Sequence, residues 1–303
     1  MRRAVLLFNP TSGRHPHKRL QIIADIAVAL RTNCTVEITP TQAPGTAGAQ
    51  AAEACKDGAD IIFACGGDGT IHEVLQGMAF QPHTALGIIP LGSANALARH
   101  LKLSLDPIEA ARAQFAHTPK TIPIGHITYQ TKTGERTRYF IVMAGAGPDG
   151  ALVYKMLSSG KHSMGRATYY LRAASIFSRT RFAPFPITHG DTTQQAVSAM
   201  AVRVADLGGL FSPLIRGASI EHPHLTLAIA SPPAILSLPA WFATSWTKTH
   251  RWNPYIHTTN VDSFHCGAAA TPIQVQADGE WLGQTPMTVA LIPNALRLLQ
   301  PTP

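Results

Sequence analysis

The stretch CGGDGTIHEV, Cys65 to Val74, follows the apolar run ADIIFA and decides how the whole chain is interpreted. Its three glycines within four residues favour neither strand nor helix, so the backbone there does something that a side chain would obstruct. One interpretation is a tight turn, because glycine adopts positive φ angles at little steric cost. The other is a loop whose N–H groups approach an anion beside the N-terminus of the following helix. The stretch alone does not separate the two.

The first 120 residues alternate short apolar runs with segments of helical periodicity. AVLLF, TVEIT, DIIFAC and ALGIIP are typical of strands, whereas Lys18–Leu30 and Ala47–Lys56 have helical patterns. This alternation predicts a parallel sheet with helical crossovers, in which ligands bind beyond the carboxyl ends of the strands. Three loops rich in glycine and hydroxyl residues follow such strands, at 9–14, 66–70 and 92–95. We therefore expect a phosphate site built from these loops, without a Walker A lysine.

From about residue 122 the pattern changes to short alternating segments such as HLTLAIA, IQVQA and MTVALIP. These predict an antiparallel β domain, interrupted by a basic and aromatic helical pair from Ala151 to about Ser178. We predict an α/β fold with a nucleotide-binding domain over 1–122, to which residues 293–303 can return, and a β-sandwich domain over 123–292. Prolines interrupt the apolar stretch Leu225–Ala243, so a membrane-spanning helix is not expected.

Charge and cysteine content narrow the class of partner. The 303 residues carry a formal net charge of +8, and no acid occurs between Asp149 and Asp191. That segment holds six cations: Lys155, Lys161, Arg166, Arg172, Arg179 and Arg181. Such a bias favours an anionic partner, whether nucleotide, nucleic acid or membrane, over a merely soluble basic protein. The four cysteines have no paired spacing and are typical of reduced thiols in a cytosolic protein.

The motifs NPTSG, GGDGT, PLGSAN, GAGPDG and QADGE occur in the order found in the diacylglycerol kinase catalytic family. The chain resembles that family, which includes soluble bacterial diacylglycerol kinases, sphingosine kinases and ceramide kinases, over essentially its whole length. GGDGT alone is shared with NAD kinases, but the full set of motifs is much more specific for the diacylglycerol kinase catalytic family. The resemblance implies an NAD kinase-like nucleotide domain and a β-sandwich domain with ATP between them. It also implies Mg²⁺-dependent transfer of the γ-phosphoryl group to a lipid hydroxyl.

The resemblance assigns residues by position. The implied ATP contacts are Asn9, Gly13, Thr41, Gly66, Gly67, Asp68, Gly69, Thr70, Ser93 and Asn95. Asp278 matches the family's proton acceptor, with Glu280 beside it, and Asp68 matches the carboxylate that works with Mg²⁺. In sphingosine kinases that second carboxylate is the favoured base, so the choice between Asp68 and Asp278 stays open. Phosphoryl transfer needs such a carboxylate, although Asp-Gly alone would indicate an ordinary hairpin turn.

The sequence departs from the family pattern at two places. Ala96 stands where many members have an aspartate in the third loop. His222 and Pro223 replace the Asp-Gly of a loop that holds a structural Mg²⁺ in other members, so this metal site is not expected unless Glu221 substitutes. The pair His222 and His224 is more typical of surface or capping residues than of a transition-metal site, because no further ligands accompany it.

We expect an ATP-dependent lipid kinase that acts on diacylglycerol or on a sphingoid or ceramide-type lipid. The expected partners are this lipid alcohol and an anionic membrane surface, not nucleic acid, and the expected location is cytoplasmic, peripheral at the inner membrane face. Expected lipid or membrane contacts are Asp149, Lys161, Arg166 and Arg172. The alternatives are a soluble NAD kinase-like enzyme, disfavoured because no Asn-Glu dipeptide occurs, and a non-catalytic relative, disfavoured because the motif carboxylates are intact.

Overall fold

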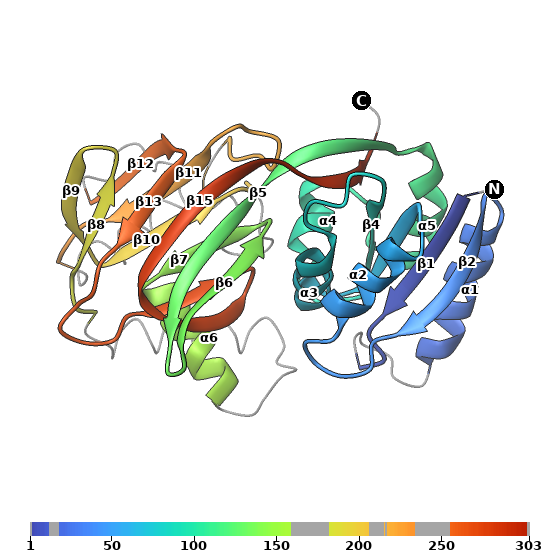
Figure 1. Cartoon of the computed structure of the whole chain (residues 1–303), viewed down its shortest axis with the longest axis horizontal. Coiled ribbons are helices and arrows are strands. Elements are labelled where there is room, and N and C mark those ends of the chain that lie inside the picture. The colour runs from blue at the N-terminus through green and yellow to red at the C-terminus, as the bar shows by residue number, and fades with distance from the viewer. Residues whose placement is uncertain are drawn as a thin grey trace. The chain divides into compact units, whose positions relative to one another are not determined.

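The computed structural model describes residues 2–11, 18–158, 182–205, 215, 217–233 and 255–301. The chain folds into two compact units. The first contains Met1–Ile124 and Ile292–Pro303, and the second contains Gly125–Ala205 and Leu210–Leu291. The chain passes from the first unit to the second along strand β5 (Thr118–Thr131) and returns along β15 (Glu280–Gln300), as Figure 1 shows.

The first unit is built on a parallel sheet, as the sequence predicts. Its strands are β1 (Arg2–Phe8), β2 (Cys34–Pro40), β3 (Ile61–Gly66) and β4 (Ala85–Pro90), in the order β4-β3-β1-β2. The last residues of β15 extend this sheet beside β4, where Leu298 pairs with Leu86. The helices are α1 (Arg19–Arg31), α2 (Ala47–Lys56), α3 (Asp68–Met78), α4 (Ala96–His100) and α5 (Pro107–Ala113). Because β1, β3 and β4 are adjacent and parallel, their carboxyl ends lie at one edge of the sheet.

The central strands of this sheet are buried on both faces, which explains their continuous apolar sequences. Every residue of β3 and β4 is buried. On one face, alternate residues of β1 such as Leu6 share a core with Ile26 and Leu30 of α1 and Ala111 of α5. Helix α5, which the sequence analysis did not identify, begins at an Asp106 cap whose Oδ1 accepts bonds from the backbone N–H groups of Ile108 and Glu109.

The second unit is antiparallel and β-rich, as predicted. Besides part of β5 and β15 it contains β6 (Gly134–Phe140), β7 (Met143–Ala146), β8 (Phe185–His189), β9 (Thr192–Ala196), β10 (Ser198–Val202), β11 (Leu225–Ala230), β12 (Ile256–Val261), β13 (Ser263–Cys266) and β14 (Gln274–Ala277). The main order is β12-β11-β10-β7-β14-β15, and β13 joins β15 to β8. Helix α6 (Pro148–Ser158) covers the start of the predicted helical pair, whose remainder lies outside the described residues.

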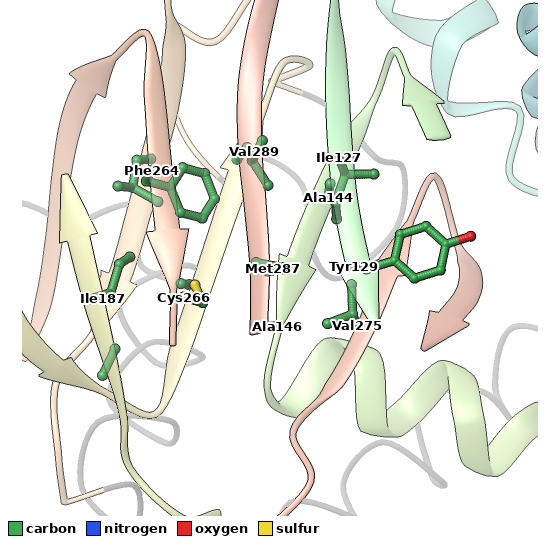
Figure 2. Packing of buried hydrophobic residues seen from close by; sticks show 14 of the residues in the cluster. Ile127, Tyr129, Ala144, Ala146, Ile187, Phe264, Cys266, Val275, Met287 and Val289 are labelled. Carbon is green, nitrogen blue, oxygen red and sulfur yellow. The ribbon is translucent and has the colours of Figure 1, made fainter. Parts of the chain in front are cut away.

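One apolar core holds this unit together. Figure 2 shows Phe264 and Cys266 of β13, Met287 and Val289 of β15, and Ile127 of β5 in the same buried cluster. Burial of large apolar side chains in such a core is worth about 1.5–3 kcal/mol each before entropy is counted. In the part of the chain that the structure describes, no helix is long and apolar enough to cross a membrane. The beginning of the apolar stretch 225–243 forms strand β11 instead.

Candidate active site

Asn9 joins the first of the three predicted loops to the second. Its backbone N–H, at the end of β1, donates to the carbonyl oxygen of Cys65, over 3.3 Å. Its side-chain Oδ1 accepts bonds from the backbone and hydroxyl of Thr11, and its Nδ2 donates to Oγ1 of Thr70 over 3.5 Å. Thr41 lies next to this loop, since its N–H donates to the carbonyl of Phe8 over 2.8 Å. Gly13 lies outside the described residues.

The second and third loops are in contact through the backbones of two glycines, Gly67 and Gly92. A methyl group added to Gly92 would lie 2.6 Å from the Cα of Gly67, and one added to Gly67 would lie 3.3 Å from the Cα of Gly92. Gly67 is extended, with φ of −88° and ψ of −175°, and Gly66 and Gly69 do not have positive φ either. Gly67 and Gly92 are therefore required by close approach and not by a left-handed turn. The connection from β3 to α3 is short, but it does not use the positive φ angles that glycine permits.

Asp68 and Asn95 fix the shape of these loops. Asp68 lies in the first turn of α3, between Gly67 at the helix cap and Gly69 and Thr70, and its Oδ1 accepts a bond from the backbone N–H of Ala96 over 2.8 Å. Asn95 is left-handed, with φ of 51°, and buried. Its Oδ1 accepts from the N–H of Gly92 and its Nδ2 donates to the carbonyl of Gly92. Ser93 is exposed within the same loop.

This edge of the sheet has the features of a phosphate site. Glycine backbones that approach closely leave N–H groups accessible, and hydroxyls and amides supply further donors. The N-terminus of α3 adds positive potential, which favours an anion there. Ala96 contributes its backbone N–H to Asp68. The donor set therefore suits a nucleotide triphosphate held without a lysine, and Asp68 is the carboxylate placed inside it.

In the second unit, Asp278 and Gly279 form the two-residue turn between β14 and β15. Both residues are left-handed, with φ of 50° and 84°, as a type I′ hairpin requires. The Asp278 side chain is directed inward and the residue is only 8% exposed. Its Oδ2 accepts a bond from the N–H of Ile141 at 2.9 Å, and its Oδ1 accepts from Val142 at 2.8 Å and Met143 at 3.0 Å. Glu280 is exposed at the start of β15.

Asp149 and Gln276 support the same turn from another side. Nε2 of Gln276 donates to Oδ2 of Asp149 over 2.9 Å, and Oε1 of Gln276 accepts from the N–H of Gly279 over 3.0 Å. The Asp149 residue is partly exposed, but its Oδ1 atom is buried, and the backbone N–H groups of Asp149 and Gly150 interact with the carboxyl. Burial raises the pKa of this carboxyl from its ordinary value near 3.8 to about 6, and the bond from Gln276 opposes that rise.

Arg203 and Gln276 are site residues that the sequence analysis did not identify. Arg203 is 1% exposed, its N–H donates to the carbonyl of Val142 and its guanidinium donates to the carbonyl of Ile220. Burial lowers its pKa to about 10, and the negative charge of Asp278 acts in the opposite direction. The sequence signal for Arg203 was its position as a single cation inside the apolar run SAMAVRVA. No sequence signal identified Gln276, because the pattern IQVQA predicts a strand with one polar, exposed face. In the structure β14 is almost wholly buried.

No group of three or more histidine, cysteine, aspartate or glutamate residues is arranged to hold a metal among the residues that the structure describes. His222 and His224 lie together, with ring centroids 5.0 Å apart, and Glu221 is exposed. All four cysteines are thiols. The expected membrane contacts Lys161, Arg166 and Arg172 lie outside the described residues.

Comparison with known proteins gives consistent matches over both units. Residues 3–127 match the diacylglycerol kinase catalytic domain, and residues 142–300 match the YegS C-terminal NAD kinase β-sandwich-like domain. A protein of Staphylococcus saprophyticus named diacylglycerol kinase is 27% identical over 288 residues, which cover 94% of this chain and 91% of that protein.

Solved structures agree at the level of the fold. A candidate diacylglycerol kinase from Bacillus anthracis superposes with a TM-score of 0.78 at 22% identity, covering 98% of this chain and 95% of that one. Yeast NADH kinase in complex with NADH superposes with a TM-score of 0.54 at 11% identity, covering 100% and 84% of the two chains. The predicted fold class is thereby confirmed. Matches to both domains, in the order that the motifs predict, show that the chain belongs to the diacylglycerol kinase catalytic family of ATP-dependent lipid kinases.

Proposed function

We propose that this lipid kinase transfers the γ-phosphoryl group of Mg²⁺-ATP to the hydroxyl of diacylglycerol. The observation that carries the proposal is the glycine-lined edge of the first unit, where the Gly67 and Gly92 backbones meet around Asp68. The naming of the Staphylococcus saprophyticus relative as a diacylglycerol kinase supports this acceptor over a sphingoid or ceramide-type lipid. We also propose domain limits of 1–122 with 293–303 for the nucleotide and 123–292 for the lipid.

The nucleotide would be held mainly by backbone and hydroxyl groups. The N–H groups of Gly66 at the end of β3 and of Gly67 and Gly69 at the start of α3 would approach the phosphates. Asn9, Thr70 and Ser93 would offer amide and hydroxyl donors beside them. Gly13 and Thr41 would complete the set from neighbouring loops. Asn95 contributes indirectly, because both of its amide groups bond to Gly92 and set the shape of the third loop. A triphosphate neutralised in this way leaves its terminal phosphorus open to attack in line.

Magnesium bound with ATP would neutralise charge that develops on the transferred group. Asp68 is the residue that we propose to work with this ion, because its carboxylate lies within the glycine loops and is oriented by the N–H of Ala96. The described residues offer no cluster for a second, structural ion, and His222 and Pro223 supply none of the carboxylate oxygens that Mg²⁺ prefers.

The acceptor hydroxyl must lose a proton as its oxygen bonds to phosphorus and ADP leaves. A carboxylate within hydrogen-bond reach of that hydroxyl is the group that receives it. Asp68 and Asp278 are the two candidates from the sequence, with Glu280 beside the second.

We propose that the enzyme meets its lipid at the cytoplasmic membrane surface as a peripheral protein. The support is the acid-free sequence between Asp149 and Asp191, whose cations include Lys161, Arg166 and Arg172. Near an anionic bilayer each such cation contributes on the order of 1 kcal/mol to binding. Tyrosine and phenylalanine residues among these cations suit the boundary between head groups and acyl chains.

A labelled-phosphate assay tests the acceptor. γ-Labelled ATP and Mg²⁺ are supplied with diacylglycerol, sphingosine, ceramide or monoacylglycerol in mixed micelles, and NAD serves as the soluble control. We expect labelled phosphatidic acid to form with the highest kcat/KM of the panel. Preferred labelling of another lipid alcohol would correct the substrate, and preferred labelling of NAD would contradict the proposed function.

A further inference from the structure

Arg203 lies where a loop of the second unit meets the sheet. It directly follows strand β10, which is flanked by β7 and β11. The N–H of Arg203 donates to the carbonyl of Val142, just before β7. The guanidinium donates to the carbonyl of Ile220, in the loop that precedes β11. One residue therefore ties this loop to the sheet across 17 positions of the sequence.

The guanidinium is buried, which is rare for a charged group. Arg203 is only 1% exposed and is among the largest fully buried side chains that the structure describes. Burial lowers its pKa to about 10, and the charge of Asp278 opposes that change, so Arg203 remains a cation at neutral pH. A buried charge is costly unless polar groups compensate it. An arginine kept at this cost indicates a structural role at the loop.

The loop that the guanidinium holds, residues 218–224, is a tight turn with few oxygen ligands for a metal. Ser219 accepts two bonds across the turn, from the N–H of Glu221 to its hydroxyl and from the N–H of His222 to its carbonyl, each over 3.3 Å. Glu221 is the single carboxylate of the loop, and it is exposed. Mg²⁺ prefers an octahedral set of oxygen ligands that includes carboxylates. The residues of this loop therefore do not fit a structural Mg²⁺.

Arg203 and a metal ion would also compete for the same backbone atom. The carbonyl oxygen of Ile220 is bonded to the guanidinium, so a Mg²⁺ ion at that oxygen would lie close to a positive charge. Two cations repel each other strongly where water is excluded. Ile220 is buried, so this repulsion is only weakly screened. The guanidinium and a metal ion are alternatives at this loop.

We propose that Arg203 takes the place of a structural metal ion in the second unit, so that the loop 218–224 is held by this guanidinium without Mg²⁺. Arginine carries a permanent charge and several donors, and it belongs to the chain, so the loop keeps its position at any Mg²⁺ concentration. This inference goes beyond the proposed function, because it concerns how the second unit is held together. Combined with that function, it implies that Mg²⁺ enters the reaction only with ATP.

Thermal unfolding of the nucleotide-free protein in EDTA and in millimolar MgCl₂ tests the proposal, with NaCl of matched ionic strength as the control. An ion that binds the folded state at about 100 times its Kd would raise the Tm of a unit of this size by roughly 5–10 °C. We expect the wild type and Glu221→Gln to show no such rise. A rise of several degrees in the wild type would overturn the proposal, and its loss in Glu221→Gln would place the ion at this loop.

Arg203→Met tests the guanidinium itself. It leaves the Ile220 carbonyl without this donor, so the Tm measured in EDTA should fall by roughly 5–10 °C. The matched control is Arg136→Met, because Arg136 is an exposed arginine of β6 in the same unit. It should keep the Tm of the wild type. Equal Tm values for Arg203→Met and the wild type would overturn the proposal. If Arg203→Met yields no folded protein, the EDTA and MgCl₂ comparison of the wild type and Glu221→Gln still decides the question.

The lipid assay gives an independent measurement of the same idea. With Mg²⁺-ATP saturating, kcat should not change as free Mg²⁺ is raised above the ATP concentration. A several-fold rise in kcat would overturn the inference that Mg²⁺ enters only with ATP. This measurement rests on the proposed function, whereas the Tm values do not. A wild-type protein that labels no lipid would therefore refute that function, while the Tm values would still report on Arg203.

Discussion

Replacing Asp149 with asparagine should remove a pH dependence from the stability of the second unit. In the folded protein burial raises the pKa of this carboxyl to about 6, above its ordinary value near 3.8. A group whose pKa is raised by folding contributes its full stability below the lower value and loses it as pH rises through the upper one. The wild type should therefore lose stability between about pH 4 and pH 6, relative to the variant.

The size of the effect follows from the two pKa values. One unit of pKa difference corresponds to about 1.4 kcal/mol, so the whole effect is about 3 kcal/mol. Much of that change falls below pH 5, where other carboxylates also titrate. Between pH 5 and pH 8 the free energy of unfolding of the wild type should fall by about 1.4 kcal/mol relative to Asp149→Asn.

Urea unfolding at pH 5, 6, 7 and 8, followed by tryptophan fluorescence, measures this difference. Trp281 lies in β15 within the second unit, where its Nε1 donates to Gln274, so its fluorescence reports on the unit that contains Asp149. Asp191→Asn, in the exposed turn between β8 and β9, controls for the loss of a surface carboxylate. A difference between wild type and Asp149→Asn that does not change with pH would refute the buried-carboxyl explanation.

Two further predictions concern the nucleotide loops and the basic segment. Gly92→Ala should weaken ATP binding by roughly tenfold in calorimetry, because its methyl group would lie 2.6 Å from the Cα of Gly67. Gly67→Ala should weaken binding less, because its methyl group would lie 3.3 Å from the Cα of Gly92. An ATP affinity of Gly92→Ala equal to that of the wild type would remove this contact from the nucleotide site. Neutralising Lys161, Arg166 and Arg172 together should weaken binding to anionic vesicles by roughly a hundredfold at low salt, and high salt should weaken the wild type similarly. Equal vesicle binding by both proteins would exclude docking through these cations.

Much of the fold could be predicted because the sequences of the central strands indicate that these strands are buried. β3 and β4 are buried along their whole length, so their sequences are continuous apolar runs separated by helical patterns. Helix α5 was missed although Asp106 followed by proline is a recognised start signal. Helix α3 begins at Asp68 rather than with the apolar residues that follow, because its first turn is glycine-rich and gives no periodic signal.

The loops of the site could be located from the sequence, but the contacts that each residue makes in them could not be predicted. The carboxyl ends of parallel strands predict where Gly67 and Gly92 lie, whereas their contact depends on the register of two separate loops. Asn95 is predicted as a nucleotide contact, and the sequence did not indicate that its amide also bonds to Gly92. The charge of Asp278 acts on the buried guanidinium of Arg203, which is far from it in the sequence, so this interaction depends on tertiary structure.

The most direct test of the account is transfer of the terminal phosphoryl group from labelled ATP to diacylglycerol by the wild type and by Asp68→Asn in the same assay. We predict that the wild type forms labelled phosphatidic acid. Asp68→Asn should form it about 10²–10⁴-fold more slowly with its Tm unchanged, because an amide neither accepts the hydroxyl proton nor supports Mg²⁺ as a carboxylate does. Label that appears only in inorganic phosphate or NAD, or equal rates for the two proteins, would contradict the account.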